Sequence, residues 1–286
     1  MIPQLLMGGL LSGAIYALAA MGFVLLWQAS RTINFAQGEF IMLPAFGVVL
    51  FQEVLKLPFP AAVGLTLLGS MAMGLVVKQF IVQPLLRREI LAIVIATLGI
   101  ALFARNFIIV FWTADPVFYP SIFSTKPWRW REVVVSPEDL WVLGLVSLLI
   151  LLVQLLIRHT KMGWAMQAVA QNREVARVVG INVSRTMAQV YLLNGLMMGV
   201  AAIMIAPIYF VQYNLGISLG LKAFYSAVIG GFNQVKGALF GGFLVGLLET
   251  FGAAYISTAY RDAFALVVLI GVLLLKPEGI FGIREE

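Results

Sequence analysis

Cysteine is absent from the chain, and histidine occurs once, at His159. Without cysteine the protein forms no disulfide, no thiolate metal site and no cysteine nucleophile. One histidine and 13 scattered acidic residues also exclude a histidine-based metal cluster. The same shortage removes bis-histidine haem and iron–sulfur ligation and so disfavours a membrane subunit of a redox complex. We expect no metal and no resident cofactor.

Charged residues are also scarce, at 11% of the 286 residues, whereas a soluble domain carries about a quarter. Apolar residues make up 62% of the chain, and the mean hydropathy is +0.99. Too few polar side chains remain to cover a water-facing surface, so lipid surrounds most of the chain. The net charge of +6 would suggest nucleic acid in a soluble protein. Here it reports basic loops, and no nucleic-acid partner is expected.

Long apolar stretches fill most of the sequence. A helix needs about 20 apolar residues to cross a bilayer, and we predict an all-α, polytopic helical bundle of about eight spans. The candidate spans are residues 5–27, 34–54, 58–77, 90–113, 139–157, 188–212, 218–256 and 262–276. The stretch 218–256 is too long for one helix and glycine-rich, so we expect two membrane segments joined near Asn233. We treat residues 1–286 as a single transmembrane domain, whose first span is retained because no signal cleavage site follows it.

Basic residues orient the chain, because lysine and arginine gather in cytoplasmic loops. The loops over 158–187 and 78–89 are the most basic. Their basic residues are Arg158, Lys161, Arg173, Arg177 and Arg185 in the first loop, and Lys78, Arg87 and Arg88 in the second. We therefore predict that both loops, and the C-terminal sequence KPEGIFGIREE, lie in the cytoplasm.

The loop over 114–138 and the N-terminus fall on the opposite, periplasmic side when the spans alternate. This outer loop contains Lys126, Arg129 and Arg131, which run against the charge rule. The orientation accordingly depends on the two more basic loops.

Glycine clusters inside two predicted spans. The first cluster is Gly8, Gly9 and Gly13, and the second is Gly237, Gly241, Gly242 and Gly246. Small residues four positions apart let helix backbones approach closely, so we expect tight helix packing there. The segments GGLLSGAIYAL and GGFLVGLLETF also resemble each other faintly, which hints at an internal repeat.

The 158–187 loop contains a short polar helix signal. Asn172 is a good N-cap residue, Glu174 and Arg177 match the helix dipole, and Gly180 suits a left-handed end. Three valines at helical spacing form one apolar stripe: Val175, Val178 and Val179. Such a helix either lies on lipid headgroups or docks into a groove of a soluble partner. Its short apolar face favours docking.

Four segments, in order along nearly the whole chain, are similar to motifs of one known family. AVAQNREVARVVGINV resembles that family's cytoplasmic coupling loop, and TINFAQGEFIML resembles its INFAHGE-type motif, with Gln37 where histidine is common. AVIGGFNQVKGALFGGFLVGLLE resembles a late glycine-rich block, and LLLKPEGIFG an LRPxGLFG ending. The family is that of bacterial ABC-importer permeases of the branched-chain amino-acid class, and the length resembles the shorter of its two permease subunits.

The resemblance implies a non-enzymatic, gated pathway in the bacterial inner membrane. A second permease subunit would complete a heterodimer, a periplasmic binding protein would deliver the solute, and two cytoplasmic ATPase subunits would bind ATP. This chain has no GxxxxGKS/T phosphate loop. The residues implied at the ATPase are Asn172, Arg173, Glu174, Val175, Arg177, Val178, Val179 and Gly180, with the valines in a groove and the charged residues at its rim. Relatives carry branched-chain amino acids, urea, short amides or aromatic acids.

Ionisable groups at membrane depth cost about 2.5–3.5 kcal/mol each on insertion scales and invite a functional interpretation. Glu39, Arg105 and Glu249 are such groups, and an Arg105–Glu249 ion pair is one hypothesis for them. The candidates for the pathway or its gate are Asn34, Gln37, Glu39, Arg105, Asn106, Tyr191, Asn194 and Glu249. Buried amides also serve simply to bind neighbouring helices. The alternative function is an ion-coupled secondary transporter that uses Glu39 or Glu249 as its ion site.

Overall fold

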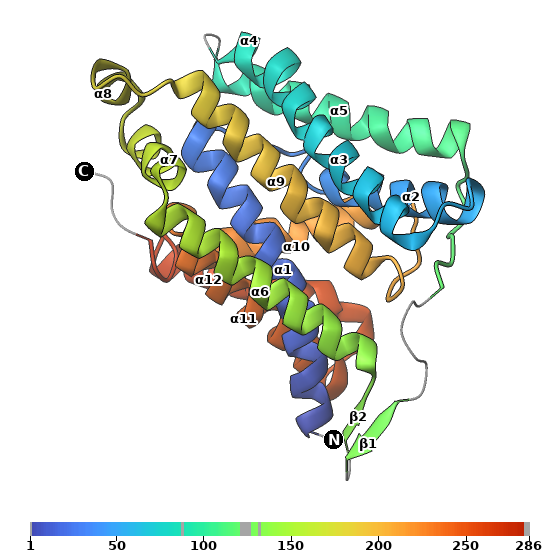
Figure 1. Cartoon of the computed structure of the whole chain (residues 1–286). Coiled ribbons are helices and arrows are strands. Elements are labelled where there is room, and N and C mark those ends of the chain that lie inside the picture. The colour runs from blue at the N-terminus through green and yellow to red at the C-terminus, as the bar shows by residue number, and fades with distance from the viewer. Residues whose placement is uncertain (1, 87–88, 121–126, 131–132, 283–286) are drawn as a thin grey trace. The chain divides into compact units, whose positions relative to one another are not determined.

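A computed structural model describes residues 2–86, 89–120, 127–130 and 133–282 of the chain (Figure 1). Some residues of the orientation argument lie outside the described residues. These are Arg87, Arg88, Lys126, Arg131 and the C-terminal residues 283–286.

The described chain is almost entirely helical, which confirms the all-α class. The helices are α1 (Ile2–Ser30), α2 (Glu39–Val49), α3 (Phe59–Val77), α4 (Gln83–Leu85), α5 (Ile90–Phe111), α6 (Pro137–His159), α7 (Lys161–Gln171), α8 (Arg173–Val178), α9 (Val183–Ile205), α10 (Leu215–Gly230), α11 (Val235–Tyr255) and α12 (Arg261–Leu275). The π-helical turns η1 (Leu50–Val54) and η2 (Lys78–Val82) extend α2 and α3, and the 3-10 turn η3 (Thr258–Tyr260) precedes α12. Strands β1 (Trp128–Trp130) and β2 (Val133–Val135) pair antiparallel.

In the described part of the chain, seven helical segments are long and apolar enough to cross a membrane. They are Ile2–Ser30, Phe59–Leu85, Leu91–Phe111, Pro137–His159, Val183–Ile205, Val235–Tyr255 and Thr258–Leu275. The shorter apolar helix α10 is separated from α11 by residues 231–234. The expected break near Asn233 is confirmed, and so is the polytopic membrane fold.

Two predicted spans have different starts in the structure. The span predicted over 34–54 begins as a helix only at Glu39, because Asn34 forms a turn in which its Oδ1 accepts from the N–H of Ala36 at 3.1 Å. The span predicted over 188–212 begins earlier, at Val183, because Asn182 caps it by accepting from the N–H of Arg185 at 2.9 Å.

Residue contacts divide the chain into two compact units, each assembled from separate segments. Unit 1 comprises Met1–Val24, Pro120–Leu149 and Leu221–Glu286, and unit 2 comprises Leu25–Tyr119 and Ile150–Gly220. Three of the four boundaries fall inside α1, α6 and α10, and the fourth lies between Tyr119 and Pro120, outside the helices.

Unit 2 is built around α3 and α9, which lie side by side, and α2 packs against both (Figure 1). Glycines bring these helices into backbone contact. A Cβ at Gly74 would collide with the carbonyl of Tyr191, and one at Gly195 would collide with Ser70. The polar turn before α2 is thereby held against the same helices, since Gln37 bonds Asn194 of α9.

In unit 1 the two glycine-rich segments pack against each other. A Cβ at Gly246 of α11 would collide with the backbone of Gly13 in α1, and one at Gly242 would collide with Ala17. The predicted tight packing is confirmed, and it joins the two segments whose sequences are alike. Their likeness therefore has a packing reason, while an internal repeat stays a prediction.

The α1–α11 contact predicts a large effect of one added side chain. Replacing Gly246 by valine should strongly destabilise the protein, since overpacking costs about 1–3 kcal/mol even where side chains can yield, and backbone atoms cannot. Thermal unfolding in detergent measures this. Gly144→Val in α6 is the matched control, because a Cβ at Gly144 has no neighbour within 4 Å. Equal melting temperatures for the two variants would contradict the contact.

Candidate functional site

The short helix α8 forms as its sequence predicts. The Oδ1 of Asn172 accepts from the backbone N–H groups of Glu174 and Val175, at 2.9 and 3.1 Å. These bonds satisfy donors that the first turn of any helix leaves free, which confirms Asn172 as the N-cap. Glu174 lies in the first turn and Arg177 in the last, as the helix dipole favours.

The C-terminal end of α8 is a Schellman motif. Gly180 has φ +85°, a conformation that costs a residue with a Cβ. Its N–H donates to the carbonyl of Arg177, and the N–H of Ile181 donates to that of Ala176 at 2.9 Å. The predicted left-handed end is confirmed, and both ends of this short helix are hydrogen-bonded without help from another chain.

The valine stripe of α8 is exposed. Val175, Val178 and Val179 are 58%, 86% and 67% exposed, whereas Ala176 is buried. The buried alanine sets which face of α8 packs inward, so the valines necessarily point away from unit 2. An apolar face of three residues is thus presented outside the membrane-spanning helices.

The neighbouring helices hold α8 in place. Helix α7 (Figure 1) is capped by Thr160, whose hydroxyl accepts from the N–H of Gly163 at 3.0 Å, and it packs on α9. Arg31, after the end of α1, donates to the carbonyl of Ala170 at 2.7 Å. Helix α8 is therefore in direct contact with both α7 and α9.

Arg173 points inward, although the sequence placed it at a rim with Glu174 and Arg177. Its side chain is half-buried, and within the described chain its Nε and Nη2 atoms have no hydrogen-bond partner. Burial, and then the nearby positive charges of Arg31 and Arg177, lower the pKa of Arg173 from its usual value. The guanidinium still stays charged at neutral pH, since the ordinary value is far above 7.

In unit 2 two polar pairs lie among the spans. Gln37 and Asn194, both fully buried, exchange two hydrogen bonds between their amides, at 2.8 and 3.2 Å. Glu39, at the start of α2, accepts from Nε and Nη2 of Arg105, each at 2.6 Å. A paired carboxylate costs far less at this depth than a free one. Each of these four polar side chains is thus paired with one from a different segment of the chain.

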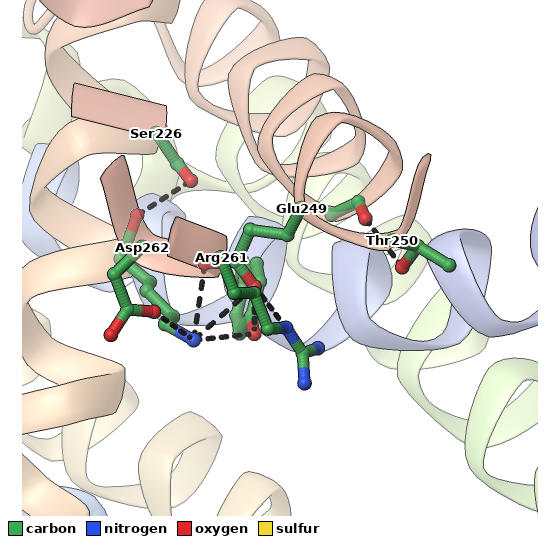
Figure 2. A network of polar contacts seen from close by, with 8 residues as sticks. Ser226, Glu249, Thr250, Arg261 and Asp262 are labelled. Carbon is green, nitrogen blue, oxygen red and sulfur yellow. Dashed lines mark hydrogen bonds and ion pairs between the residues drawn. The ribbon is translucent and has the colours of Figure 1, made fainter. Parts of the chain in front are cut away.

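In unit 1 Glu249 is the centre of a larger network (Figure 2). Its carboxylate is fully buried, lies 3.0 Å from Nζ of Lys222 and accepts from the hydroxyl of Tyr16 at 2.9 Å. Arg261 approaches the same carboxylate at 3.5 Å, and Asp262 lies 3.1 Å from Lys222. Two acids and two bases leave the network without net charge.

The hypothesis of an Arg105–Glu249 ion pair is wrong, because Arg105 binds Glu39 and Glu249 binds Lys222. Lys222 was missed among the buried ionisable residues. Its signal was present, since Lys222 is a charged residue inside the predicted span 218–256. The spacing of Lys222 and Glu249 in the sequence did not reveal that they pair, because only the tertiary fold brings α10 and α11 together.

The remaining pathway candidates differ in their surroundings. Tyr191 is fully buried and its hydroxyl bonds Ser30. Asn34 is buried, and its Nδ2 has no partner among the described residues. Asn106 is exposed on α5 and donates to the carbonyl of Leu102 in its own helix at 2.8 Å. The structure thus joins Gln37 with Asn194 and Glu39 with Arg105, and links Asn106 to none of them.

Comparison with known proteins identifies the family. A family model described as the permease component of the branched-chain amino acid transport system matches residues 5–273. The high-affinity branched-chain amino acid transport system permease protein LivH of Escherichia coli K12 is 28% identical, over 99% of this chain and 96% of LivH. The corresponding protein BraD of Pseudomonas aeruginosa PAO1 is 28% identical over the same shares.

More distant likeness reaches other importers. The ribose import permease protein RbsC of Escherichia coli K12 is 27% identical over 63% of this chain and 59% of RbsC. No solved structure matches the chain with statistical significance. The family match includes the α8 segment, the turn before α2 and the glycine-rich α11, and it covers far more than half of the chain. This multi-pass membrane protein therefore belongs to the family of branched-chain amino acid transport system permease components.

Proposed function

We propose that this chain is the permease subunit of an ABC importer in the inner membrane of a bacterium. Together with a second permease subunit it forms the gated pathway for branched-chain amino acids or related small amphipathic solutes. Two cytoplasmic ATPase subunits bind ATP, and a periplasmic binding protein delivers the solute. The family match and the likeness to LivH and BraD support this proposal.

The geometry of α8 carries the proposal. Fully burying one valine is worth about 1.5–3 kcal/mol, so the exposed stripe of Val175, Val178 and Val179 is stabilised by a partner that covers it. Lipid is a poor occupant, because a helix of six residues offers too little apolar area for firm adsorption. A groove on an ATPase subunit fits the stripe, with Glu174 and Arg177 at its rim and the caps Asn172 and Gly180 keeping the helix rigid.

The solute that we propose for the pathway, an amino acid, is a zwitterion at neutral pH. We assign the pathway or its gate to the polar residues among the spans: Asn34, Gln37, Glu39, Arg105, Asn106, Tyr191, Asn194 and Glu249. Pairing of Glu39 with Arg105, and of Glu249 with Lys222, removes net charge from the interior. A passage of this kind neither traps nor repels a solute that carries one positive and one negative group.

The ion-coupled alternative has less support. Its ion sites would be Glu39 or Glu249, and each of these carboxylates already has a cationic partner within the chain, at 2.6 and 3.0 Å. A proton or sodium ion would have to displace an arginine or a lysine. This alternative also leaves the exposed valines of α8 without a role.

The coupling role of α8 predicts that Val178→Asp, and likewise Arg177→Glu, abolishes ATP-driven uptake while ATP hydrolysis continues. Val178→Asp puts a charge where the apolar face meets the ATPase, and Arg177→Glu reverses a charge at the rim of that contact. Uptake and hydrolysis are measured together in proteoliposomes that contain the complete transporter. Lys161→Glu, at the far end of α7, is the matched control and should behave as the wild type. Normal uptake by Val178→Asp would remove the assignment.

The energy source gives a second prediction. With ATP held constant, uptake should persist when a protonophore collapses the proton gradient, because Glu39 and Glu249 are occupied by cations of the chain. Solute uptake by proteoliposomes, with and without the protonophore, measures this. Collapse of uptake under these conditions would favour the ion-coupled transporter.

The Glu249 network gives a third prediction. Lys222→Met alone leaves a buried carboxylate short of a cation and should destabilise the protein by up to about 3–5 kcal/mol. The double variant Lys222→Met/Glu249→Gln removes both charges and should regain most of the melting temperature. Its uptake should stay low if Glu249 acts in the pathway. Full recovery of uptake with stability would reduce Glu249 to a structural role.

A further inference from the structure

A cavity of about 330 Å³ lies beside α8, within unit 2. This volume falls in the range of about 300–1,000 Å³ that small-molecule sites occupy. The polar residues lining it are Lys78, Gln83, Arg173, Arg177 and Ser184. Among the described residues that line the cavity, three are cationic and none is acidic, so the cavity carries an uncompensated positive charge.

Within the described part of the chain, Lys78 is buried without a counter-ion. The residue is 4% exposed, and its Nζ donates to the side chains of Gln79 at 3.4 Å, of Ser184 at 2.9 Å and of Gln83. All three acceptors are neutral. A buried ammonium is costly unless an anion is close, and amide and hydroxyl oxygens supply only part of that compensation.

Arg173 also lines this cavity and has side-chain donors without a partner among the described residues. Its Nε and Nη2 are buried and have no acceptor in the described part of the chain. These two nitrogens form the fork that binds a carboxylate or a phosphate through parallel hydrogen bonds. Arg31 and Arg177 are close enough to lower the pKa of Arg173, so like charges already crowd the site. The Arg173 guanidinium is thus a candidate bidentate donor for an anion in this cavity.

The backbone adds to the positive field. Ser184 lies in the first turn of α9, a helix of 23 residues whose positive dipole end faces this region. On the other side, the π-helical turn η2 carries Lys78 at the end of α3. The cavity therefore lies between the C-terminal end of one membrane-capable segment, Phe59–Leu85, and the N-terminal end of another, Val183–Ile205.

We propose that this cavity binds a phosphate group, held by Arg173, Lys78 and Arg177. The phosphate belongs to the headgroup of an acidic phospholipid. The cavity lies near the ends of two membrane-capable segments, where we expect lipid headgroups, and the apolar side chains of Leu86, Val183 and Met187 complete its wall. Basic pockets between membrane helices are typical sites for such headgroups. Because Arg173 begins α8, a bound lipid fixes the N-terminal end of that helix.

Titration of the purified full chain in neutral detergent tests this proposal. The probes are dioctanoyl-phosphatidylglycerol, dioctanoyl-phosphatidylcholine and inorganic phosphate, and the readouts are the melting temperature and the mass of the intact protein with its bound lipid. Phosphatidylglycerol should raise the melting temperature by several degrees, and phosphatidylcholine should not. A response to inorganic phosphate at equal concentration would identify free phosphate, in place of the lipid, as the source of the anion.

Variants locate the site. Arg173→Gln should weaken phosphatidylglycerol binding at least about tenfold, since a charge-assisted bidentate contact is lost. Arg185→Gln is the matched control, because Arg185 is an exposed arginine of the same segment that does not line the cavity. Should Arg173→Gln fail to fold, Arg177→Gln replaces an exposed lining arginine and should weaken binding severalfold.

Three outcomes would overturn the proposal. They are no response of the wild type to either anion, an equal loss in Arg185→Gln, and unchanged binding in both Arg173→Gln and Arg177→Gln. Absence of anion binding in the wild type, together with loss of ATPase assembly in Arg173→Gln, would assign the cavity to an acidic side chain of a partner subunit. None of these results depends on transport, so the lipid site and the importer assignment can fail separately.

Discussion

Lipid cannot solvate a charge, and this constraint decides how the polar side chains of the spans are arranged. Each ionised group at membrane depth needs a partner from the same chain, or its cost is several kcal/mol. Glu39 meets Arg105 in unit 2, and Glu249 meets Lys222 in unit 1. The amides of Gln37 and Asn194 satisfy each other in the same way. In these networks, as far as the chain is described, each charge faces an opposite charge.

Such pairs form only when helices come close enough for short side chains to meet, and glycine makes that possible. Gly246 lies against Gly13 in unit 1, and Gly74 and Gly195 bring α3 and α9 together in unit 2. Helices in lipid gain little from the hydrophobic effect when they associate, so close backbone packing and buried hydrogen bonds must supply the stability. Glycine contacts therefore bring the helices close together, and charge pairing neutralises the ionised side chains between them.

Around α8 the arrangement is reversed, because side chains without a partner among the described residues are left available for binding. The valines of α8 are exposed, and the cations around Arg173 and Lys78 have no acid in the cavity they line, among the residues described. The exposed valines lie on α8, and the cationic cavity is lined by α8 together with the neighbouring residues of η2 and α9. An apolar face suits a protein partner, and a cationic cavity suits a phosphate, so α8 is a natural place for two ligands to influence the same spans.

Local features were predictable from the sequence. The membrane class follows from composition, and the ends of α8 follow from Asn172 and Gly180, because caps depend on neighbours within one turn. The break near Asn233 and the tight glycine packing were also visible. The non-helical turn before Glu39, the partner of Arg105 and the role of Lys222 were not predicted from the sequence.

Which side chains pair across dozens of residues depends on which helices meet. The inward direction of Arg173 depends on which face of α8 packs against the rest of unit 2. The sequence alone therefore determined what must be buried and where helices end, while only the tertiary structure decided which charges neutralise one another and which were left without a counter-ion.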